Sequence, residues 1–441
     1  MARDPVLRAV RESARETAVP VRLVGGLVRD AALGRAAHDV DLAAGPGCAR
    51  FVAALAARFG RRPFRFRKRG VITWRIVLDG REVDVVDVGR RGFARDLARR
   101  DFTLNAVAFD PLSGLLEDPL RGLADLRRGL LRAPRPATTF RDDPVRALRA
   151  ARFLAAFPGW RLHRETAAGA AAAARALRRA SPERIRDELQ ALLLARDPRA
   201  GLRALLGLGL LPSVLPEMVA TVGCAAGPGR PDVFLHTADA LGSSPRLPGE
   251  DGAVLRWALL LHDVSKPETL ELRDDGRPTF HGHEVLGAER AEAVLRRLKH
   301  PRARVRRVKR LIALHLRPGH LADAGCPPRG VRRLVADAGE DLPLLLAHAE
   351  ADVQGTGGPP DRARRARLRR TLSILRAHGA RAADLAATPL LGGEDVMRVL
   401  QIGPGPAVGR ALAELAELRD AGTLRSRDEA LAWLDKERRA R

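Results

Sequence analysis

Two alternating carboxylates follow a pair of adjacent glycines near the start of the chain. Gly25 and Gly26 precede Arg29, and Asp39 and Asp41 complete a group that spans seventeen positions. In an extended segment alternate side chains share a face, so both aspartates would project from one side of a strand. Two carboxylates on one face can share Mg²⁺, and glycines let backbone N–H groups approach a phosphate. The pattern indicates metal-dependent phosphoryl chemistry; taken alone, it also fits an ordinary turn before an amphipathic strand.

The length and charge of the chain limit its class. At 441 residues it is too long for one compact core and suggests about two to four domains. Hydrophobic residues make up 46% and charged residues 30%, which is typical of globular chains. The formal net charge of +25 would attract a polyanion, most commonly a nucleic acid. Only five of the 78 basic residues are Lys, so part of this charge reflects an Arg bias that GC-rich coding also produces.

The cysteines and the terminal sequence bear on the compartment. Cys48, Cys224 and Cys326 are far apart and share no metal-ligand spacing, which fits a reduced interior. The first twenty residues carry charges throughout, and no later stretch offers about twenty consecutive apolar residues. We therefore expect a cytoplasmic protein that is neither exported nor inserted into a membrane. Nothing in the sequence sets an oligomeric state.

Short β-like runs recur in the first quarter of the chain. Hydrophobic alternation predicts a helix at residues 48–59 and strands at residues 21–24, 39–42, 71–78 and 82–88. From about Arg141 onward the pattern is helical, in Ala, Leu and Arg stretches that Pro and Gly interrupt. The expected fold class is therefore α+β, a small mixed head followed by an all-α remainder.

Two stretches rich in Gly and Pro divide the helical part. Residues 223–231 and 354–361 have the composition of linkers. We expect domains at residues 1–135, 136–222, 232–354 and 362–441. Residues 361–381 include eight Arg and predict a basic amphipathic helix, which could lie along an RNA backbone or form a solvated surface.

A second alternating segment, residues 82–87, offers a third acidic ligand. Asp84 could join Asp39 and Asp41 to form a two-metal site. In such a site one ion holds the phosphates of a nucleotide, and the other activates an attacking hydroxyl. Glu82 lies on the same face of the segment, so the choice between Glu82 and Asp84 stays open at this stage.

A third segment could recognise a nucleobase. In residues 142–149, Pro144 suits the first turn of a helix that an aspartate caps. Asp143, Arg146 and Arg149 then recur every three residues on one side. A carboxylate accepts from an exocyclic amine and an Arg donates to a ring nitrogen or carbonyl, so this pair could read cytosine or adenine. The alternative is a capped helix with a solvated Arg stripe.

Three motifs in succession resemble those of one family. The runs GGLVRDAALGRAAHDVDLA, RRDFTLNAVAFD and FRDDPVRALRAARF resemble the motifs of the class II tRNA nucleotidyltransferase and bacterial poly(A) polymerase family. The match continues through residues 118–129 and 181–188. Members add nucleotides to an RNA 3′ end without a nucleic-acid template. The resemblance implies a polymerase-β-like head, Mg²⁺ as cofactor, and the tRNA 3′ end, CTP and ATP as partners.

The resemblance also implies roles for single residues. Asp39, Asp41 and Asp84 would be catalytic, and the first two would hold Mg²⁺. Asp143 and Arg146 would act as an amino-acid template for CTP and ATP. The residues implied to bind the nucleotide are Gly25, Gly26, Arg29, Arg100, Asp101, Asn105, Asp143, Arg146, Arg149 and Arg152.

One departure from the family pattern concerns specificity. CCA-adding members usually carry a flexible loop between the third-acid strand and the RRD motif, whereas here only residues 85–99 intervene. Members that lack the loop tend to add only the two cytidines. We expect full CCA addition, and we keep CC-only addition, A-only addition and poly(A) synthesis as alternatives that share the same head.

A set of His and Asp residues indicates a second metal site. Residues 259–266 and 280–287 resemble segments of the HD phosphohydrolase superfamily, whose imidazole and carboxylate ligands suit a divalent transition metal that activates water. The resemblance implies the ligands His236, His262, Asp263, His283 and Asp352. His281 competes with His283 for one position, as does His320 with His315. A further alternative is therefore an HD metal phosphohydrolase whose N-terminal part only binds RNA.

Overall fold

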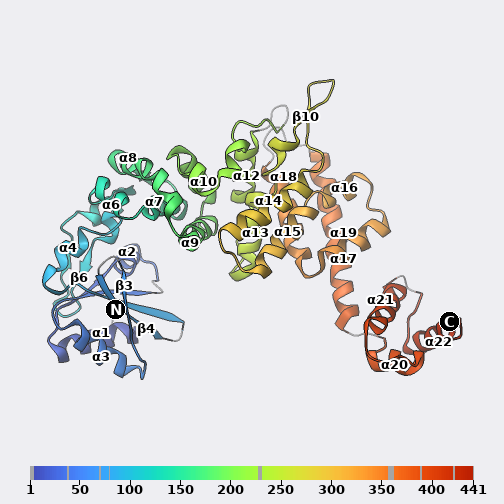
Figure 1. Ribbon diagram of the computed structural model, residues 1–441, viewed down its shortest axis with the longest axis horizontal. Coiled ribbons are helices and arrows are strands. Elements are labelled where there is room, and N and C mark those ends of the chain that lie inside the picture. Colours follow the sequence, from blue (N-terminus) through green and yellow to red (C-terminus); the bar gives the residue numbers. More distant parts are fainter. Residues whose placement is uncertain are drawn as a thin grey trace.

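The computed structural model describes residues 4–36, 39–68, 71–78, 80–226, 231–355, 362–387, 390–420 and 423–440. These residues form an arch with a sheet-containing head at one end, helices across the middle and three helices at the other end (Figure 1). The α+β class expected from the sequence is confirmed. The expected linkers at 223–231 and 354–361 lie partly outside the described residues.

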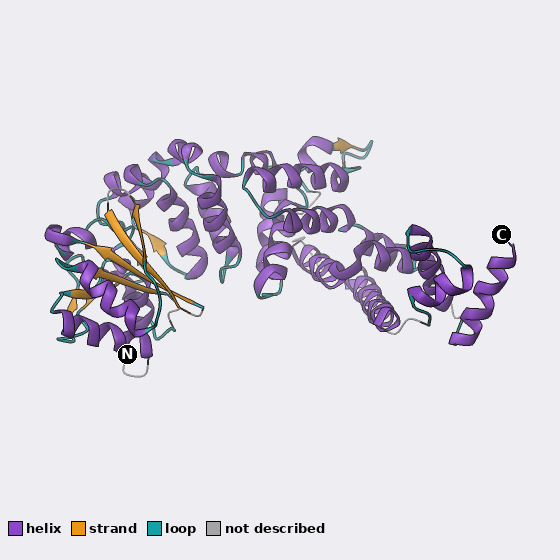
Figure 2. Ribbon diagram, turned by 60° about the horizontal axis from the view of Figure 1, so that its bottom comes forward, coloured by secondary structure: helices purple, strands orange, loops and turns teal. Residues whose placement is uncertain are grey.

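The head is built on a seven-stranded mixed sheet (Figure 2). Its strand order is β3-β4-β5-β2-β1-β6-β7, and β2 and β5 run parallel while the other neighbours are antiparallel. The strands are β1 Val21–Val24, β2 Val40–Ala44, β3 Phe64–Lys68, β4 Val71–Leu78, β5 Arg81–Asp87, β6 Ala108–Phe109 and β7 Leu116–Glu117. The edge strand β3 was not expected, because Arg and Phe alternate there without an aliphatic pattern.

Helices cover one face of this sheet and leave most of the other face to the site. Side chains such as Val40, Leu42, Val83 and Val85 pack in one core with Phe51, which lies on α3. Because side chains alternate along a strand, the residues between them face the opposite side. The helical segments of the head are α1 Pro5–Thr17, α2 Gly26–Ala32, α3 Cys48–Arg58, η1 Gly89–Arg91, α4 Phe93–Leu97, η2 Thr103–Asn105 and α5 Gly122–Arg127.

The neck follows the head as a bundle of short helices. A two-stranded parallel pairing of β8, Leu130–Leu131, with β9, Arg161–Leu162, joins its first part to the end of the head. Its helices are α6 Pro136–Asp142, α7 Val145–Ala156, α8 Arg164–Ala172, η3 Ala174–Arg179, α9 Pro182–Leu193, α10 Pro198–Gly207, α11 Leu211–Val214 and η4 Pro216–Thr221.

The next helices share one continuous core with the neck. Leu189 of the neck and Trp257 belong to the same buried cluster, and the Trp257 indole donates to Gln190 Oε1 at 2.7 Å. The elements here are α12 Val233–Ser243, α13 Gly249–Leu261, η5 Lys266–Thr269, β10 Glu271–Leu272, β11 Pro278–Thr279, α14 His283–Arg297, α15 Arg302–Leu314, α16 Arg317–Asp323, α17 Pro328–Ala338, η6 Gly339–Asp341 and α18 Leu342–Gly355. Neck and middle therefore form one packed body.

The expected basic helix belongs to this body. Helix α19, Arg362–Ala387, buries Leu368, Leu372 and Leu375 in the same core. A separate small core holds α20 Gly393–Leu400, α21 Pro406–Asp420 and α22 Arg427–Ala440 at the C-terminal end. Of all the helices described, not one combines the length and the apolar character that a membrane crossing requires.

Candidate active site and metal centre

The sheet places two of the predicted catalytic acids directly opposite each other. Asp41 in β2 is the register partner of Asp84 in the parallel strand β5, so both carboxylates project from the face that the head helices leave open. Asp39 is exposed and directly precedes β2. Burial raises the pKa of Asp41, the Arg100 guanidinium opposes that rise, and Asp84 adds to it. A group of acids whose charges repel one another suits a divalent cation, because the ion removes that repulsion.

The glycine pair brings backbone close to these acids. Gly25 has a φ of +71°, and a Cβ at this position would lie 2.6 Å from Asp41 Oδ2. A side chain would therefore displace the carboxylate and strain the backbone at once. Gly26 begins α2, whose Arg29 donates to both oxygens of Asp30 at 2.8 and 2.7 Å and to Asn105 Oδ1 at 2.9 Å.

Asp84 and Glu82 differ in their surroundings. Arg75, the register partner of Asp84 on β4, donates to both oxygens of Asp84 at 2.6 and 2.7 Å. The same guanidinium lies 2.6 Å from Glu82, whose side chain is about twice as exposed as that of Asp84, at 47% against 24%. The register opposite Asp41 favours Asp84 as the third acid. Arg75 was not among the residues expected at the site.

A buried network connects the RRD motif to the neck. Asp101 accepts from Asn105 Nδ2 at 2.9 Å and from the Phe102 N–H at 2.8 Å, and Arg149 of α7 lies 2.7 Å from its other oxygen. Burial raises the pKa of Asp101, but Arg149 and Asn105 outweigh it and hold that pKa at about 2. Glu188 of α9 continues the network, 2.9 Å from Arg152 and 3.8 Å from Arg149. Its role was not expected, since the sequence does not show which helices pack together.

The proposed base-reading residues also meet at the start of α7. The expected aspartate cap is wrong, because α7 begins at Val145 with Pro144 at the N-cap and no side-chain hydrogen bond at that cap. The Asp143 carboxylate is buried and instead accepts from Arg184 of α9 at 2.8 Å, with Arg146 at 3.8 Å. This arrangement holds a carboxylate beside two guanidiniums at the edge of an open hollow.

Two adjoining hollows lie between head and neck. The larger, of 620 Å³, includes Gly25, Asp41, Asn105 and Arg152 in its lining. The smaller, of 340 Å³, includes Asp143, Arg146 and Arg184. Both are lined by Arg100, Asp101 and Arg149. Every residue predicted to bind the nucleotide lines at least one of the two, and together they suit a charged ligand that extends from acids and glycines to the base-reading pair.

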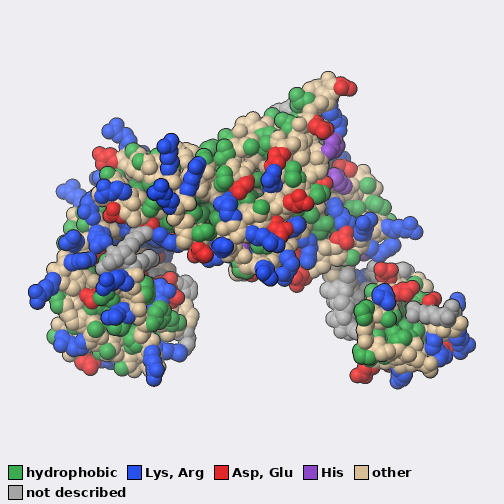
Figure 3. Space-filling view, viewed as in Figure 1, with side chains coloured by type: hydrophobic (Ala, Val, Ile, Leu, Met, Phe, Trp, Pro, Cys, Tyr) green, Lys and Arg blue, Asp and Glu red, His purple; other side chains and the backbone are tan. Residues whose placement is uncertain are grey.

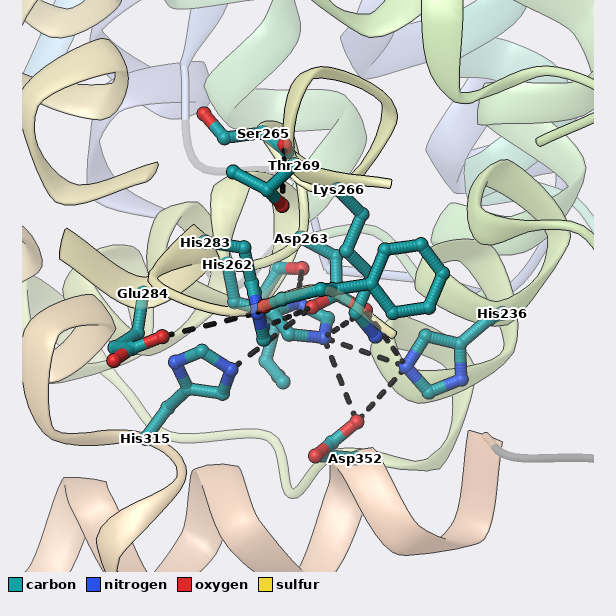
Figure 4. Close-up of polar contacts among 12 residues, drawn as sticks. His236, His262, Asp263, Ser265, Lys266, Thr269, His283, Glu284, His315 and Asp352 are labelled. Atoms are coloured by element: carbon teal, nitrogen blue, oxygen red, sulfur yellow. Dashed lines mark hydrogen bonds and ion pairs between the residues drawn. The ribbon is translucent and has the colours of Figure 1, made fainter. Parts of the chain in front are cut away.

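A second cluster lies in the middle of the chain (Figure 4). Two groups of three residues each hold ligand atoms close enough to share a metal ion, His236, His262 and Asp352 in one and Asp263, His283 and His315 in the other. They are linked, because Asp263 Oδ2 lies 3.1 Å from His262 Nε2 and 3.4 Å from His236 Nε2. All five residues predicted for this site come together, and His315 joins them, whereas His281 and His320 are exposed.

The backbone orients three of these imidazoles for metal binding. The Nδ1 atoms of His262, His283 and His315 lie 2.9, 2.6 and 2.6 Å from the carbonyl oxygens of Leu259, Phe280 and Ile312. A carbonyl can only accept, so each Nδ1 carries a proton and each Nε2 faces the cluster, where it can bind a metal ion that takes the place of any proton on that nitrogen.

Charge and unsatisfied atoms also fit a metal here. Burial lowers the pKa of His262, but Asp263 and Asp352 outweigh it and raise that pKa to about 10, whereas burial lowers the pKa of His315 to about 3. Asp263 Oδ1 and His283 Nε2 are buried and lie 3.4 Å apart, and neither atom makes a hydrogen bond to any other group among the described residues. The two donor groups therefore suit one or two divalent ions of the imidazole-binding kind.

The structure adds one more imidazole that the sequence did not single out. His348 is fully buried on α18, and its ring centre lies 5.1 Å from that of His262 and 5.7 Å from that of His315. It is four residues before Asp352, so both face the same side of the helix. The four-residue spacing of His348 and Asp352 is visible in the sequence. It points to the cluster only once α18 is known to pack against it.

A mixed sheet that places Asp41 opposite Asp84 beside a basic, glycine-lined hollow is the arrangement expected of a nucleotidyltransferase, here joined to a second, His-rich candidate metal centre. Comparison with known proteins agrees with this class. Residues 21–132 match the poly A polymerase head domain, residues 159–221 a probable RNA and SrmB-binding site of polymerase A, and residues 234–384 the HD domain.

Relatives span nearly the whole chain. An A-adding tRNA nucleotidyltransferase of Deinococcus radiodurans is 39% identical, with 94% of each chain covered. A CC-adding tRNA nucleotidyltransferase of Thermus thermophilus is 36% identical, with 93% of this chain and 92% of the relative covered. The fold matches the Thermotoga maritima CCA-adding enzyme complexed with tRNA, at a TM-score of 0.62, 19% identity and coverage of 98% and 96%. The chain therefore belongs to the tRNA nucleotidyltransferase and poly(A) polymerase family and is an enzyme of the nucleotidyltransferase class.

The register of β2 and β5 predicts unequal roles for the two candidate third acids. Asp84→Asn should lower kcat for nucleotide addition by roughly a hundredfold or more, because a carboxylate facing Asp41 contributes several kcal/mol as a metal ligand. Glu82→Gln, the matched change two residues away, should lower kcat less than about fivefold, since it alters only an exposed ion pair. Single-turnover rates at saturating Mg²⁺ measure both. Equal losses in the two variants, with unchanged melting temperatures, would contradict the assignment.

Proposed function

We propose that this enzyme adds the two cytidines of the CCA end to tRNA, without a nucleic-acid template, which is the CC-only alternative rather than the full CCA addition expected from the sequence. The observation that carries the cytidine assignment is the short, anchored connection between Asp84 and the RRD motif. In this proposal residues 1–135 perform the transfer, 136–222 read the base and bind RNA, 232–354 form the HD unit, and 362–441 add a basic helical segment whose first helix, α19, packs in the core of the HD unit.

The transfer joins the 3′ oxygen of the RNA to the α-phosphorus of CTP as the bond to pyrophosphate breaks. Mg²⁺ held by Asp39 and Asp41, with Asp84 beside them, would activate the hydroxyl and offset charge on the phosphates. Gly25 and Gly26 leave room for the triphosphate, and Arg29, Arg149 and Arg152 supply cations around the same hollow. The Asp101 network keeps these guanidiniums in place before the nucleotide arrives.

The paired Asp143 and Arg146 suit the edge of cytosine. Cytosine presents one amine donor beside two acceptors, N3 and O2, whereas adenine presents one donor and one acceptor on that edge. A carboxylate and a forked guanidinium supply one acceptor and two donors, which matches all three cytosine groups. Arg184 lies 2.8 Å from the Asp143 carboxylate and holds it in one position. The pair therefore favours a single base.

The connection from β5 to the RRD motif supports addition of one kind of nucleotide. Val88 and Leu97 are buried against Val24 and Ala106, and Phe93 packs on the same small core. Asp87 Oδ1 also accepts from the Gly89 N–H at 3.0 Å. Because the segment at residues 85–99 is short and anchored, we infer that it does not move across the hollow. It therefore would not change the position of the base-reading pair to accept ATP.

Purified enzyme with Mg²⁺ and tRNA that ends before CCA should add two cytidines from CTP and stop there when ATP is also present. The physical reason is the fixed cytosine-reading pair. Products resolved to single nucleotides measure this directly. A third addition of A would instead establish full CCA addition, and A added only to tRNA that already ends in CC would assign the A-adding activity of the Deinococcus radiodurans relative.

Substitution of the template carboxylate should change base choice. Asp143→Asn places an amide donor where cytosine presents its own amine, and that donor matches the O4 acceptor of uracil. We expect kcat/KM for CTP to fall by roughly tenfold or more and the ratio of UTP to CTP use to rise. Asp142→Asn is the matched control, because that side chain is exposed and lies 3.8 Å from the exposed Arg141. An unchanged UTP to CTP ratio in Asp143→Asn would remove Asp143 from base reading.

The His-rich centre supports a second activity, hydrolysis of a phosphoester. The observation that favours it is the pair of buried three-residue donor groups, in which Asp263 Oδ1 and His283 Nε2 face each other without a good hydrogen bond. Metal bound there would supply an activated water. Lys266, 2.6 Å from Asp263 Oδ2, adds a cation beside this centre that suits a phosphate group.

Removal of a shared ligand should separate the two activities. His262→Ala should lower bound transition metal to well below one ion per chain and abolish hydrolysis of a 2′,3′-cyclic nucleotide, because this imidazole is central to the cluster. Nucleotide addition should stay within about twofold, since the catalytic acids lie in the head. His320→Ala, which changes an exposed imidazole, should affect neither. Metal analysis that shows full occupancy in His262→Ala would contradict the assigned centre.

A further inference from the structure

One rung of side chains crosses four strands of the head sheet and begins at the catalytic acids. Asp41 of β2 is the register partner of Asp84, Asp84 of Arg75, and Arg75 of Phe64 on the edge strand β3. Register partners project from the same face of a sheet. Phe64 therefore shares the open face with the acids, three strand spacings or about 14 Å from Asp41.

Phe64 belongs to a small surface group that we call the ledge, made of Phe64, Phe66 and Arg75. The two rings have centres 6.2 Å apart, and the Arg75 guanidinium carbon lies 5.7 Å from the centre of the Phe66 ring. Phe64 is 50% exposed and is the only aromatic among the large apolar side chains that are exposed in the described part of the chain. An aromatic ring held open beside a guanidinium suits stacking of a nucleobase.

The surroundings of the ledge are cationic. Arg62 precedes β3 and is exposed. Arg65 and Arg67 are also exposed, but they alternate with the two Phe residues along β3 and therefore project from the opposite face of the sheet. Lys and Arg side chains are also scattered over the head and neck in the view of Figure 3. Phosphate groups are attracted to such cations, and aromatic rings beside basic groups are typical of proteins that bind single strands.

The ledge lies outside the two nucleotide hollows, so a different part of the substrate could bind there. Their lining reaches Val71 and Thr73 on β4, and Thr73 pairs with Phe66, but Phe64 lies one further pair along the strands. The triphosphate hollow lies on the other side of Asp41, around Gly25 and Arg152. An RNA 3′ end that must reach the acids while the nucleotide fills its hollows can approach over β5, β4 and β3.

We propose that the ledge binds the single-stranded 3′ end of the tRNA, with one of its last bases stacked on Phe64, and so delivers the 3′ hydroxyl to the acids. This inference rests on the proposed nucleotide addition in the head. Phe64 would contact the RNA already bound and would make no contact with the incoming nucleotide. Its loss should then affect use of tRNA and leave the affinity for CTP unchanged.

The test uses the full-length enzyme and tRNA that ends before CCA, with 2-aminopurine in turn at each of its last three positions. Stacking quenches this fluorophore. Without nucleotide, wild type and Phe64→Trp should quench one of the three positions, whereas Phe64→Leu should not, because it keeps apolar volume but removes the ring. With CTP, Phe64→Leu should raise KM for tRNA roughly tenfold at an unchanged KM for CTP.

Leu116→Ala is the matched control, since Leu116 is an exposed apolar side chain on the opposite edge strand of the same sheet. It should behave as wild type in both assays. Equal quenching by wild type and Phe64→Leu would overturn the proposal, as would a rise in KM for CTP alone, which would place the incoming base on the ledge. If wild type adds no nucleotide at all, the proposed function fails, and the fluorescence measurement still reports separately on the ledge.

Discussion

The nucleotide site depends on a single buried carboxylate. Asp101 comes from the head, but one of its partners, Arg149, comes from the neck, at 2.7 Å. A buried charge is costly unless it is paired and hydrogen-bonded, and breaking such a pair typically costs about 3–5 kcal/mol. The ion pair therefore ties the two parts of the chain together at the point where the two hollows meet. Without it the triphosphate-binding residues and the base-reading pair would lose their common frame.

The two sides of the catalytic acids have different proposed functions, nucleotide binding on one side and RNA binding on the other. Glycines and guanidiniums lie on one side of Asp41, and the ledge continues the sheet on the other. The neck in turn shares a continuous core with the HD unit, which includes Leu189 and Trp257, so the second metal centre is held by packing rather than by a loose linker. The chain thus carries two proposed sites of phosphate chemistry, one in the head and one in the HD unit, with separate residues and separate metals proposed for each.

Sequence reasoning reached the local parts of both sites and missed the long-range ones. The glycine pair, the alternating aspartates and the adjacent His262 and Asp263 are recognisable because their spacing along the chain already defines a shared face. The choice of Asp84 over Glu82 required the register of two strands that are distant in sequence. Glu188 and His348 required knowledge of which helices pack together, as did the choice of His315 over His320. The failed aspartate cap shows that a tertiary partner can outweigh a local preference.

The central claim is that one nucleotide spans both hollows, held at the shared wall of Arg100, Asp101 and Arg149. A crystal structure of the enzyme with Mg²⁺ and a non-hydrolysable analogue of CTP measures this most directly. The account predicts a triphosphate beside Gly25 and Arg152 and a cytosine within hydrogen-bond distance of Asp143 and Arg146. A base that lies outside the smaller hollow, or a triphosphate distant from the glycine pair, would contradict it.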